Sequence, residues 1–149
     1  MEEPRSAEQR IADTHAHLEG DADLWIATAG DGRPWLVPLS FHWTGEVVLM
    51  VTLRASRTYR NLAAGSAARL ALGHTRDVVM IDAAVDLPEQ LAEDEATAVA
   101  SVSGLDPRTD ADAAYLRCRP QRVQAWRTSA EIEGRTIMRD GTWSTLHAG

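Results

Sequence analysis

The segment LRASRTYRNL, residues 53–62, combines arginines with hydroxyl side chains in a chain whose formal net charge is -7. Ser56 or Thr58 can cap a short helix that Gly65 ends, and the free N–H groups and dipole of such a helix attract an anion to its N-terminus. The side chains that add charge or hydroxyl groups to this turn are Thr52, Arg54, Ser56, Arg57 and Thr58. Guanidinium and hydroxyl groups together suit a phosphate better than a carboxylate, so the segment predicts a phosphate site, with solvated surface charge as the alternative.

A second motif, DTHAHL at residues 13–18, resembles the first metal-binding motif of the amidohydrolases and TatD-type hydrolases. In those enzymes the motif ends the first strand of a barrel that usually needs at least about 200 residues, whereas here a helical pattern precedes it in a chain of 149. At helical spacing His15 and His17 point about 200° apart, so we predict no metal site. The chain also lacks a Gly-x-Ser-x-Gly elbow, a Walker loop and a GxGxxG motif, which leaves triad catalysis and parallel α/β nucleotide binding without support.

Composition predicts one globular domain over residues 1–149, because 44% of the residues are hydrophobic and 25% are charged. No stretch approaches the roughly 18 apolar residues of a membrane helix, and the N-terminus lacks the regions of a signal peptide, so we expect a cytoplasmic protein without a membrane partner. The acidic balance argues against nonspecific nucleic-acid binding, which needs a basic face. Cys118 is the single cysteine, which excludes a disulfide within the chain.

Apolar periodicity and turn signals predict a mainly β protein with short helices. The helices are expected at 7–19, capped by Ser6 with Gln9; at the arginine-rich turn up to Gly65; and at 89–103, opened by Pro88. The strands are expected at 24–28, 35–43, 46–53, 67–75, 77–87 and 119–127, followed by a hairpin that turns at Asp140 and Gly141. Such a chain predicts a small antiparallel barrel with helices at its rim, whose open edges favour association with a second copy and a pocket between copies.

Three stretches, in this order, resemble the FMN-binding split β-barrel superfamily, which includes the pyridoxamine 5'-phosphate oxidases and the deazaflavin-dependent oxidoreductases. They are LWIATAGDGRPWLVPLSFHWTGE, VLMVTLRASRTYRNLAAG with its Ser-basic-x-x-x-Asn-Leu signature, and SAARLALGH. The resemblance covers about two-thirds of the chain, from Leu24 to Trp126. It implies a homodimeric split β-barrel whose two flavin-type cofactors lie at the subunit interface.

The resemblance also implies which residues meet the cofactor. Its phosphate would be held by Thr52, Ser56, Arg57 and Thr58. Ser40, His42 and Met50 would border the cofactor, and Trp126 would lie near its ring, from the same subunit or from the partner. The implied activity is hydride transfer between this cofactor and a small organic substrate, with no side chain identified as a catalytic acid or base.

Two departures narrow the implied chemistry. Where pyridoxamine 5'-phosphate oxidases show Arg-x-Val-Leu-Leu-Lys, residues 35–40 read WLVPLS without either cation, so vitamin B6 oxidation is not expected. All 15 basic residues are Arg, a bias typical of the GC-rich actinobacteria whose small relatives often use the deazaflavin coenzyme F420, which we therefore prefer over FMN. Arg54 and Arg60 flank the turn and would meet the acidic tail of that coenzyme. The alternative is a protein that binds or sequesters flavin, deazaflavin or haem without turnover.

Overall fold

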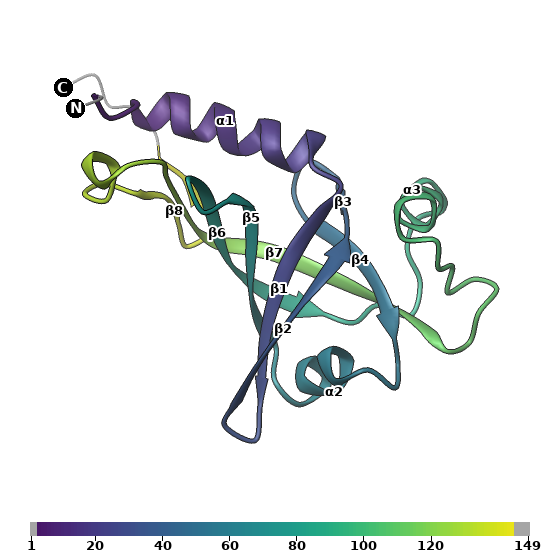
Figure 1. Ribbon diagram of the computed structural model, residues 1–149. Helices are drawn as coiled ribbons and strands as arrows, with labels where there is room; N and C mark the ends of the chain where they lie inside the picture. Colours follow the sequence, from purple (N-terminus) through teal and green to yellow (C-terminus); the bar gives the residue numbers. More distant parts are fainter. Residues whose placement is uncertain (1–2, 145–149) are drawn as a thin grey trace.

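A mainly antiparallel sheet with helices at its margins forms the computed structural model, which describes residues 3–144 (Figure 1). The helices are α1 (Ala7–Gly20), α2 (Arg57–Ala64) and α3 (Glu93–Ser103), with a short 3-10 helix at Ser129–Glu131. The strands are β1 (Asp23–Gly30), β2 (Arg33–Ser40), β3 (His42–Trp43), β4 (Val48–Leu53), β5 (Ala67–His74), β6 (Asp77–Asp86), β7 (Ala113–Trp126), β8 (Thr136–Arg139) and β9 (Thr142–Trp143). The predicted mainly β class is confirmed.

The strands pair in the order β2-β1-β5-β6-β7-β4-β3, and β8 joins through β7. All of these pairs are antiparallel. The sheet curls, so that β2 at one end of the path lies close to β4 at the other. Figure 1 shows α1 across the top of this curled sheet, α2 below it and α3 to one side.

Strand β7 is the longest strand and pairs with β6, β4 and β8, and its start was predicted too late from the sequence. It begins at Ala113 rather than at residue 119, and its first half pairs with β4 while its second half pairs with β6. Residues 113–118 mix small and large apolar side chains after a polar loop, so no strong local signal marks the beginning of the strand. Its pairing with β4 supplies the hydrogen bonds that make this segment a strand.

Two further boundaries differ from expectation. Helix α3 begins after Ala92, whose backbone is extended, so Pro88 does not open it, and acidic residues occupy its first turn, where the helix dipole favours them. The strand expected over residues 35–43 divides at the buried Phe41 into β2, which pairs with β1, and β3, which pairs with β4. The N–H of Phe41 donates to the carbonyl of Ala22 at 3.2 Å, which holds the chain at this crossing.

The core lies on both faces of β4. Val48 and Met50 point into the main cluster, where Leu18 of α1 and Leu62 of α2 also pack. The side chains of β4 that alternate with them, Leu49 and Val51, pack under α3 in a second cluster. Burial on both faces makes β4 a rigid support for the turn that follows it. Among the helices described, none is long and apolar enough to cross a membrane.

Candidate functional site

The turn from β4 into α2 has the local geometry that its sequence predicts. Ser56 is the N-cap of α2, and its Oγ accepts the N–H of Tyr59 at 3.1 Å. The Oγ1 of Thr52 lies 3.2 Å from the same hydroxyl oxygen. The N–H groups of Arg57 and Thr58, in the first turn of the helix, have no carbonyl partner within it. The turn therefore presents free N–H donors and two linked hydroxyl groups at one point.

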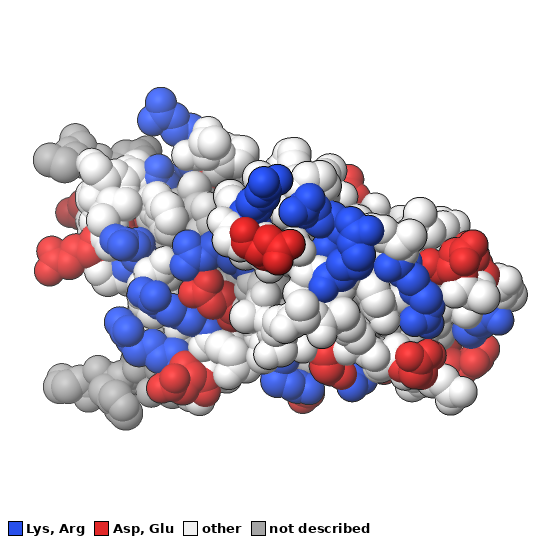
Figure 2. All heavy atoms as spheres, turned by 90° about the horizontal axis from the view of Figure 1, so that it is seen from below, with Lys and Arg blue, Asp and Glu red and all other residues white. Residues whose placement is uncertain are grey.

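Two arginines of α2 bring positive charge to this turn. The guanidinium of Arg57 lies over the ring of Trp35, 5.4 Å from its centroid. Within residues 3–144, neither Arg57 nor Arg60 contacts a carboxylate, whereas Arg69 pairs with Asp82 and Arg117 with Asp86. Figure 2 views the molecule from the side of α2 and shows basic side chains gathered on this face. The charge of these two arginines is available to a ligand.

A groove of about 410 Å³ lies beside the turn, between α2 and the β1–β2 hairpin. It is lined by Gly30, Asp31, Arg57, Arg60, Asn61 and Ala64. We call the β4–α2 turn with Arg57 the anion cradle and this neighbouring hollow the arginine groove. An elongated ligand with a phosphate in the cradle has room to extend along the groove.

Asn61 positions α2 against the sheet, a role that the sequence did not reveal. Its Nδ2 donates to Oγ1 of Thr28 on β1 at 3.1 Å, and both side chains are buried. A Cβ atom at Gly30 would lie 2.1 Å from Oδ1 of Asn61, so only glycine lets the strand and the helix approach this closely. The Ser-basic-x-x-x-Asn-Leu pattern contained the signal, but the partner on β1 is 33 residues away in the sequence.

Gly30→Ala should therefore lower the free energy of unfolding by about 1–3 kcal/mol, because the new methyl group displaces Asn61 from Thr28. Urea denaturation of the variant and the wild type measures the change. Gly20→Ala is the matched control, since a Cβ at Gly20 meets nothing within 4 Å. Equal stability of the Gly30 variant and the wild type would contradict the positioning role of Asn61.

Arg54 points away from the arginine groove. Its guanidinium donates to the carbonyl of Ala111 at 3.1 Å and to the hydroxyl of Tyr59 at 3.3 Å, and it meets Glu89 at 3.4 Å. Within a single chain, the structure therefore does not bring Arg54 and Arg60 together at the arginine groove. The hydrogen bond from Arg54 to Ala111 instead stabilises the loop that precedes β7.

The other residues assigned to the cofactor are spread over the strands. Ser40 ends β2, at the opposite end from the β1–β2 hairpin that lines the arginine groove, and its hydroxyl donates to Asp23 at 2.6 Å. His42 begins β3 and pairs with Leu49, the second residue of β4, whereas the cradle lies at the other end of β4. Met50 is fully buried in the main core, so its side chain does not border an open site. Trp126 is the last residue of β7 and pairs with Val78 of β6. The first residues of β7 pair with the end of β4, beside the cradle. A single chain therefore keeps Trp126 away from the cradle.

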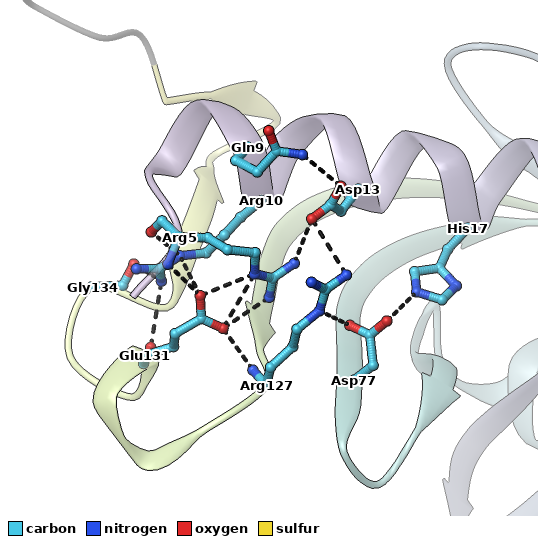
Figure 3. Close-up of polar contacts among 9 residues, drawn as sticks. All are labelled: Arg5, Gln9, Arg10, Asp13, His17, Asp77, Arg127, Glu131 and Gly134. Atoms are coloured by element: carbon cyan, nitrogen blue, oxygen red, sulfur yellow. Dashed lines mark hydrogen bonds and ion pairs between the residues drawn. The ribbon is translucent and has the colours of Figure 1, made fainter. Parts of the chain in front are cut away.

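Asp13 and His17 of the DTHAHL motif belong to one network of ion pairs and hydrogen bonds, which Arg127 and Asp77 connect (Figure 3). Asp13 pairs with Arg5 at 2.8 Å and with Arg127 at 3.4 Å. His17 bonds Asp21 and Asp77 through its two ring nitrogens, and His15 packs against the ring of Trp143. Burial lowers the pKa of His17, but the hydrogen bonds to its two aspartates outweigh it and raise the pKa. The motif thus serves helix docking, and the described residues contain no cluster of three or more metal-ligating side chains.

Comparisons with known proteins identify the fold. A family model described as Pyridoxamine 5'-phosphate oxidase matches residues 15–127. Among solved structures, an F420 reductase has a TM-score of 0.61 at 21% identity, covering 73% of this chain and 94% of its own. A FAD-binding protein from Mesorhizobium loti has a TM-score of 0.65 at 17% identity, covering 82% and 93%. The haem storage protein HutZ from Vibrio cholerae has the same TM-score and identity, covering 76% and 92%.

A search of the curated proteins found no match. The likeness to the solved structures shows the fold alone, since identities of this size do not carry function. The family model, in contrast, spans more than half of the chain and includes β1, the anion cradle and all of β7. On this evidence the chain belongs to the pyridoxamine 5'-phosphate oxidase family of FMN-binding split barrels.

Proposed function

We propose that this protein is an oxidoreductase that transfers hydride between a flavin-type cofactor, preferably the deazaflavin coenzyme F420 and otherwise FMN, and a small organic substrate. The observation that carries the proposal is the anion cradle, in which Arg57 is the first residue of a helix capped by Ser56. Both cofactors contain a phosphate group, and the donors of the cradle fit a phosphate in number and charge.

The protein's own residues bind and orient the cofactor, which supplies the hydride chemistry when it is bound. The N–H groups of Arg57 and Thr58, with the hydroxyls of Thr52 and Ser56, would hold the phosphate, while Asn61 keeps α2 in place against β1. Oxidation of vitamin B6 is not part of the proposal, because β2 carries Trp35 and Ser40 where that reaction's enzymes place cations.

The cofactor is proposed to bind at the interface of a homodimer, which would bring Trp126 of one subunit toward the cradle of the other. In the single chain, large apolar side chains are exposed on the neighbouring strands β1 and β2, including Trp25 and Leu36, the latter 58% exposed. A second copy is the simplest cover for such side chains. Light scattering of the purified protein should give twice the chain mass, and a monomer that binds cofactor with full affinity would contradict this arrangement.

Turnover is tested on the purified protein loaded with each cofactor. The visible absorption spectrum identifies any cofactor that copurifies, and fluorescence titration with F420 and with FMN gives the two affinities. Reduction of the bound cofactor by an added donor, followed by its reoxidation on adding an electron acceptor, would support the oxidoreductase. Tight binding without either step would favour the alternative of storage, the role for which the haem storage protein of the same fold is named.

The arginine groove predicts which cofactor binds more tightly. F420 trails an acidic tail beyond its phosphate, so Arg60→Ala should weaken F420 binding by roughly two- to fivefold, the effect of an exposed ion pair, and leave FMN binding unchanged. High salt should reduce the preference in the wild type. Arg54→Ala is the matched control, since Arg54 faces Glu89 and Ala111 rather than the groove. Equal losses of both cofactors in the Arg60 variant, or tighter binding of FMN by the wild type, would contradict the assignment.

A further inference from the structure

A second cavity, of about 410 Å³, lies on the α3 side of the sheet. Its walls come from the segment before α3, the first turn of α3, the loop that follows α3, and β7. They are Glu89, Gln90, Leu91, Glu93, Pro107, Arg108 and Tyr115. Tyr115 pairs with Val51 of β4, and both side chains lie in the cluster under α3. Thr52, the next residue of β4 and part of the anion cradle, points to the opposite face of the sheet. The α3 cavity is therefore separate from the arginine groove.

Tyr115 brings an unsatisfied polar group to this cavity. The residue is 3% exposed, and its hydroxyl has no hydrogen-bond partner within residues 3–144. Burial raises the pKa of this hydroxyl, with a further contribution from Asp106, so the group stays protonated and neutral. A buried hydroxyl without a partner is costly to a fold, and a ligand that bonds to it recovers that cost.

The charges around the cavity decide which kind of ligand fits. Arg108 directs its N–H groups to Asp106, Glu93 and Thr97, at distances between 2.9 and 3.2 Å, so its charge is already neutralised. Three carboxylates, those of Asp106, Glu93 and Glu89, face two arginines: Glu93 pairs with Arg108 through Oε1, and Glu89 at the rim pairs with Arg54 through Oε2. The excess of one negative charge repels an anion, and the second carboxylate oxygen of Glu89 and of Glu93 has no partner within residues 3–144, so each can accept a hydrogen bond from a cation.

We propose that the α3 cavity binds a small organic cation, an ammonium or guanidinium group on a short apolar chain. The N–H groups of the cation donate to the Tyr115 hydroxyl oxygen and to the carboxylates of Glu89 and Glu93. Its carbon chain lies against Leu91 and Pro107, which provide the apolar part of the wall. Because Tyr115 is 3% exposed, entry of the cation requires side chains of the cavity wall to move, and Glu89 and Gln90 are the exposed residues of that wall before α3. This site does not depend on the proposed cofactor.

Calorimetric titration at low salt with n-butylammonium, n-butanol and butyrate tests the proposal, because the three probes share a carbon chain and differ in their head groups. We expect n-butylammonium to bind and the other two to bind at least tenfold more weakly. Tyr115→Phe should weaken the binding of n-butylammonium by about fivefold to tenfold, the effect of one hydrogen bond. Equal binding of all three probes, preference for butyrate, or an unchanged affinity in the Phe variant would overturn the proposal.

Two further measurements separate binding from structure. Glu93→Gln should weaken n-butylammonium binding. Glu95→Gln, in the same helical turn but outside the cavity wall, should leave this binding unchanged. Equal effects of the two substitutions would show that the cation responds only to the general charge of α3 and would overturn the proposal. The melting temperature of free Tyr115→Phe should equal or exceed that of the wild type, since the substitution removes a buried hydroxyl without a partner. A clear fall in melting temperature would show that the hydroxyl already has a partner in the free protein and would overturn the proposal.

Discussion

Replacing Arg57 with alanine should weaken the binding of F420 and of FMN alike by roughly 10- to 100-fold, about 1.5–3 kcal/mol for a lost charge-assisted contact. Arg57 is the first residue of α2, its guanidinium lies over the ring of Trp35, and it has no carboxylate partner within residues 3–144, so its charge is available to a ligand in the cradle. The free energy of unfolding should change by less than about 1 kcal/mol, since the residue is half-buried and its ring contact with Trp35 is a weak one. Fluorescence titration and urea denaturation of the same preparation measure both quantities.

Two variants control this experiment. Arg57→Lys keeps the charge but loses the planar fork, so its affinity should fall between those of the wild type and the alanine variant. Arg76→Ala removes the same charge at the exposed turn between β5 and β6, at the opposite end of β5 from α2, and should leave both affinities unchanged. If Arg57→Ala binds both cofactors as tightly as the wild type does, the phosphate does not lie in this cradle.

Glu131→Gln should lower the free energy of unfolding at pH 7 by about 3 kcal/mol, because it removes the counter-charge of the buried Arg10 and one of the two carboxylates that pair with Arg5. The side chain of Glu131 is 3% exposed and accepts hydrogen bonds from the side chain and the N–H of Arg5 and from the N–H of Arg127, at distances between 2.7 and 3.3 Å (Figure 3). Arg10, also buried, lies 3.7 Å from its carboxylate. These contacts fasten α1 to the short helix after β7.

The same carboxylate predicts how stability depends on pH. Hydrogen bonds from the side chain of Arg5 lower the pKa of Glu131 from 4.5 to about 2. Burial opposes this shift, and hydrogen bonds from the backbone N–H groups of Arg5 and Arg127 add to it. A pKa depressed in the folded state stabilises the fold above the unfolded value, and this contribution is lost as the pH falls from about 4.5 to 2. Wild-type stability should decline over that interval more steeply than the stability of Glu131→Gln, as urea denaturation at successive pH values would show.

Glu133→Gln is the matched control, since Glu133 is exposed two residues further along the chain. It should keep the wild-type stability at pH 7 and the wild-type decline in acid. A Glu131 variant with wild-type stability at pH 7 would show that the contacts of Glu131 with Arg5, Arg10 and Arg127 contribute nothing to the stability of the fold.

Local patterns in the sequence were sufficient for the parts of the fold whose hydrogen bonds close within a few residues. Ser6 and Ser56 cap α1 and α2 as expected, and the turn at Asp140 and Gly141 has the positive φ angles of its hairpin. A capping hydroxyl needs only the N–H three residues ahead, so neighbouring residues decide its geometry. The start of β7 could not be predicted in this way, because its partner on β4 is about 60 residues away.

The same distinction between local and long-range contacts applies to the candidate site. The anion cradle could be identified from the sequence, because a strand end, a capping serine, an arginine and a helix are consecutive in the chain. The tertiary structure was needed to show that Arg60 and Arg57 line one groove while Arg54 points toward Glu89. It was also needed to show that Asn61 bonds to Thr28, and that the buried hydroxyl of Tyr115 has no partner in the described chain. A side chain's type and spacing specify which contacts it can make, whereas the long-range pairing of strands and the packing of helices on them decide which of those contacts it meets.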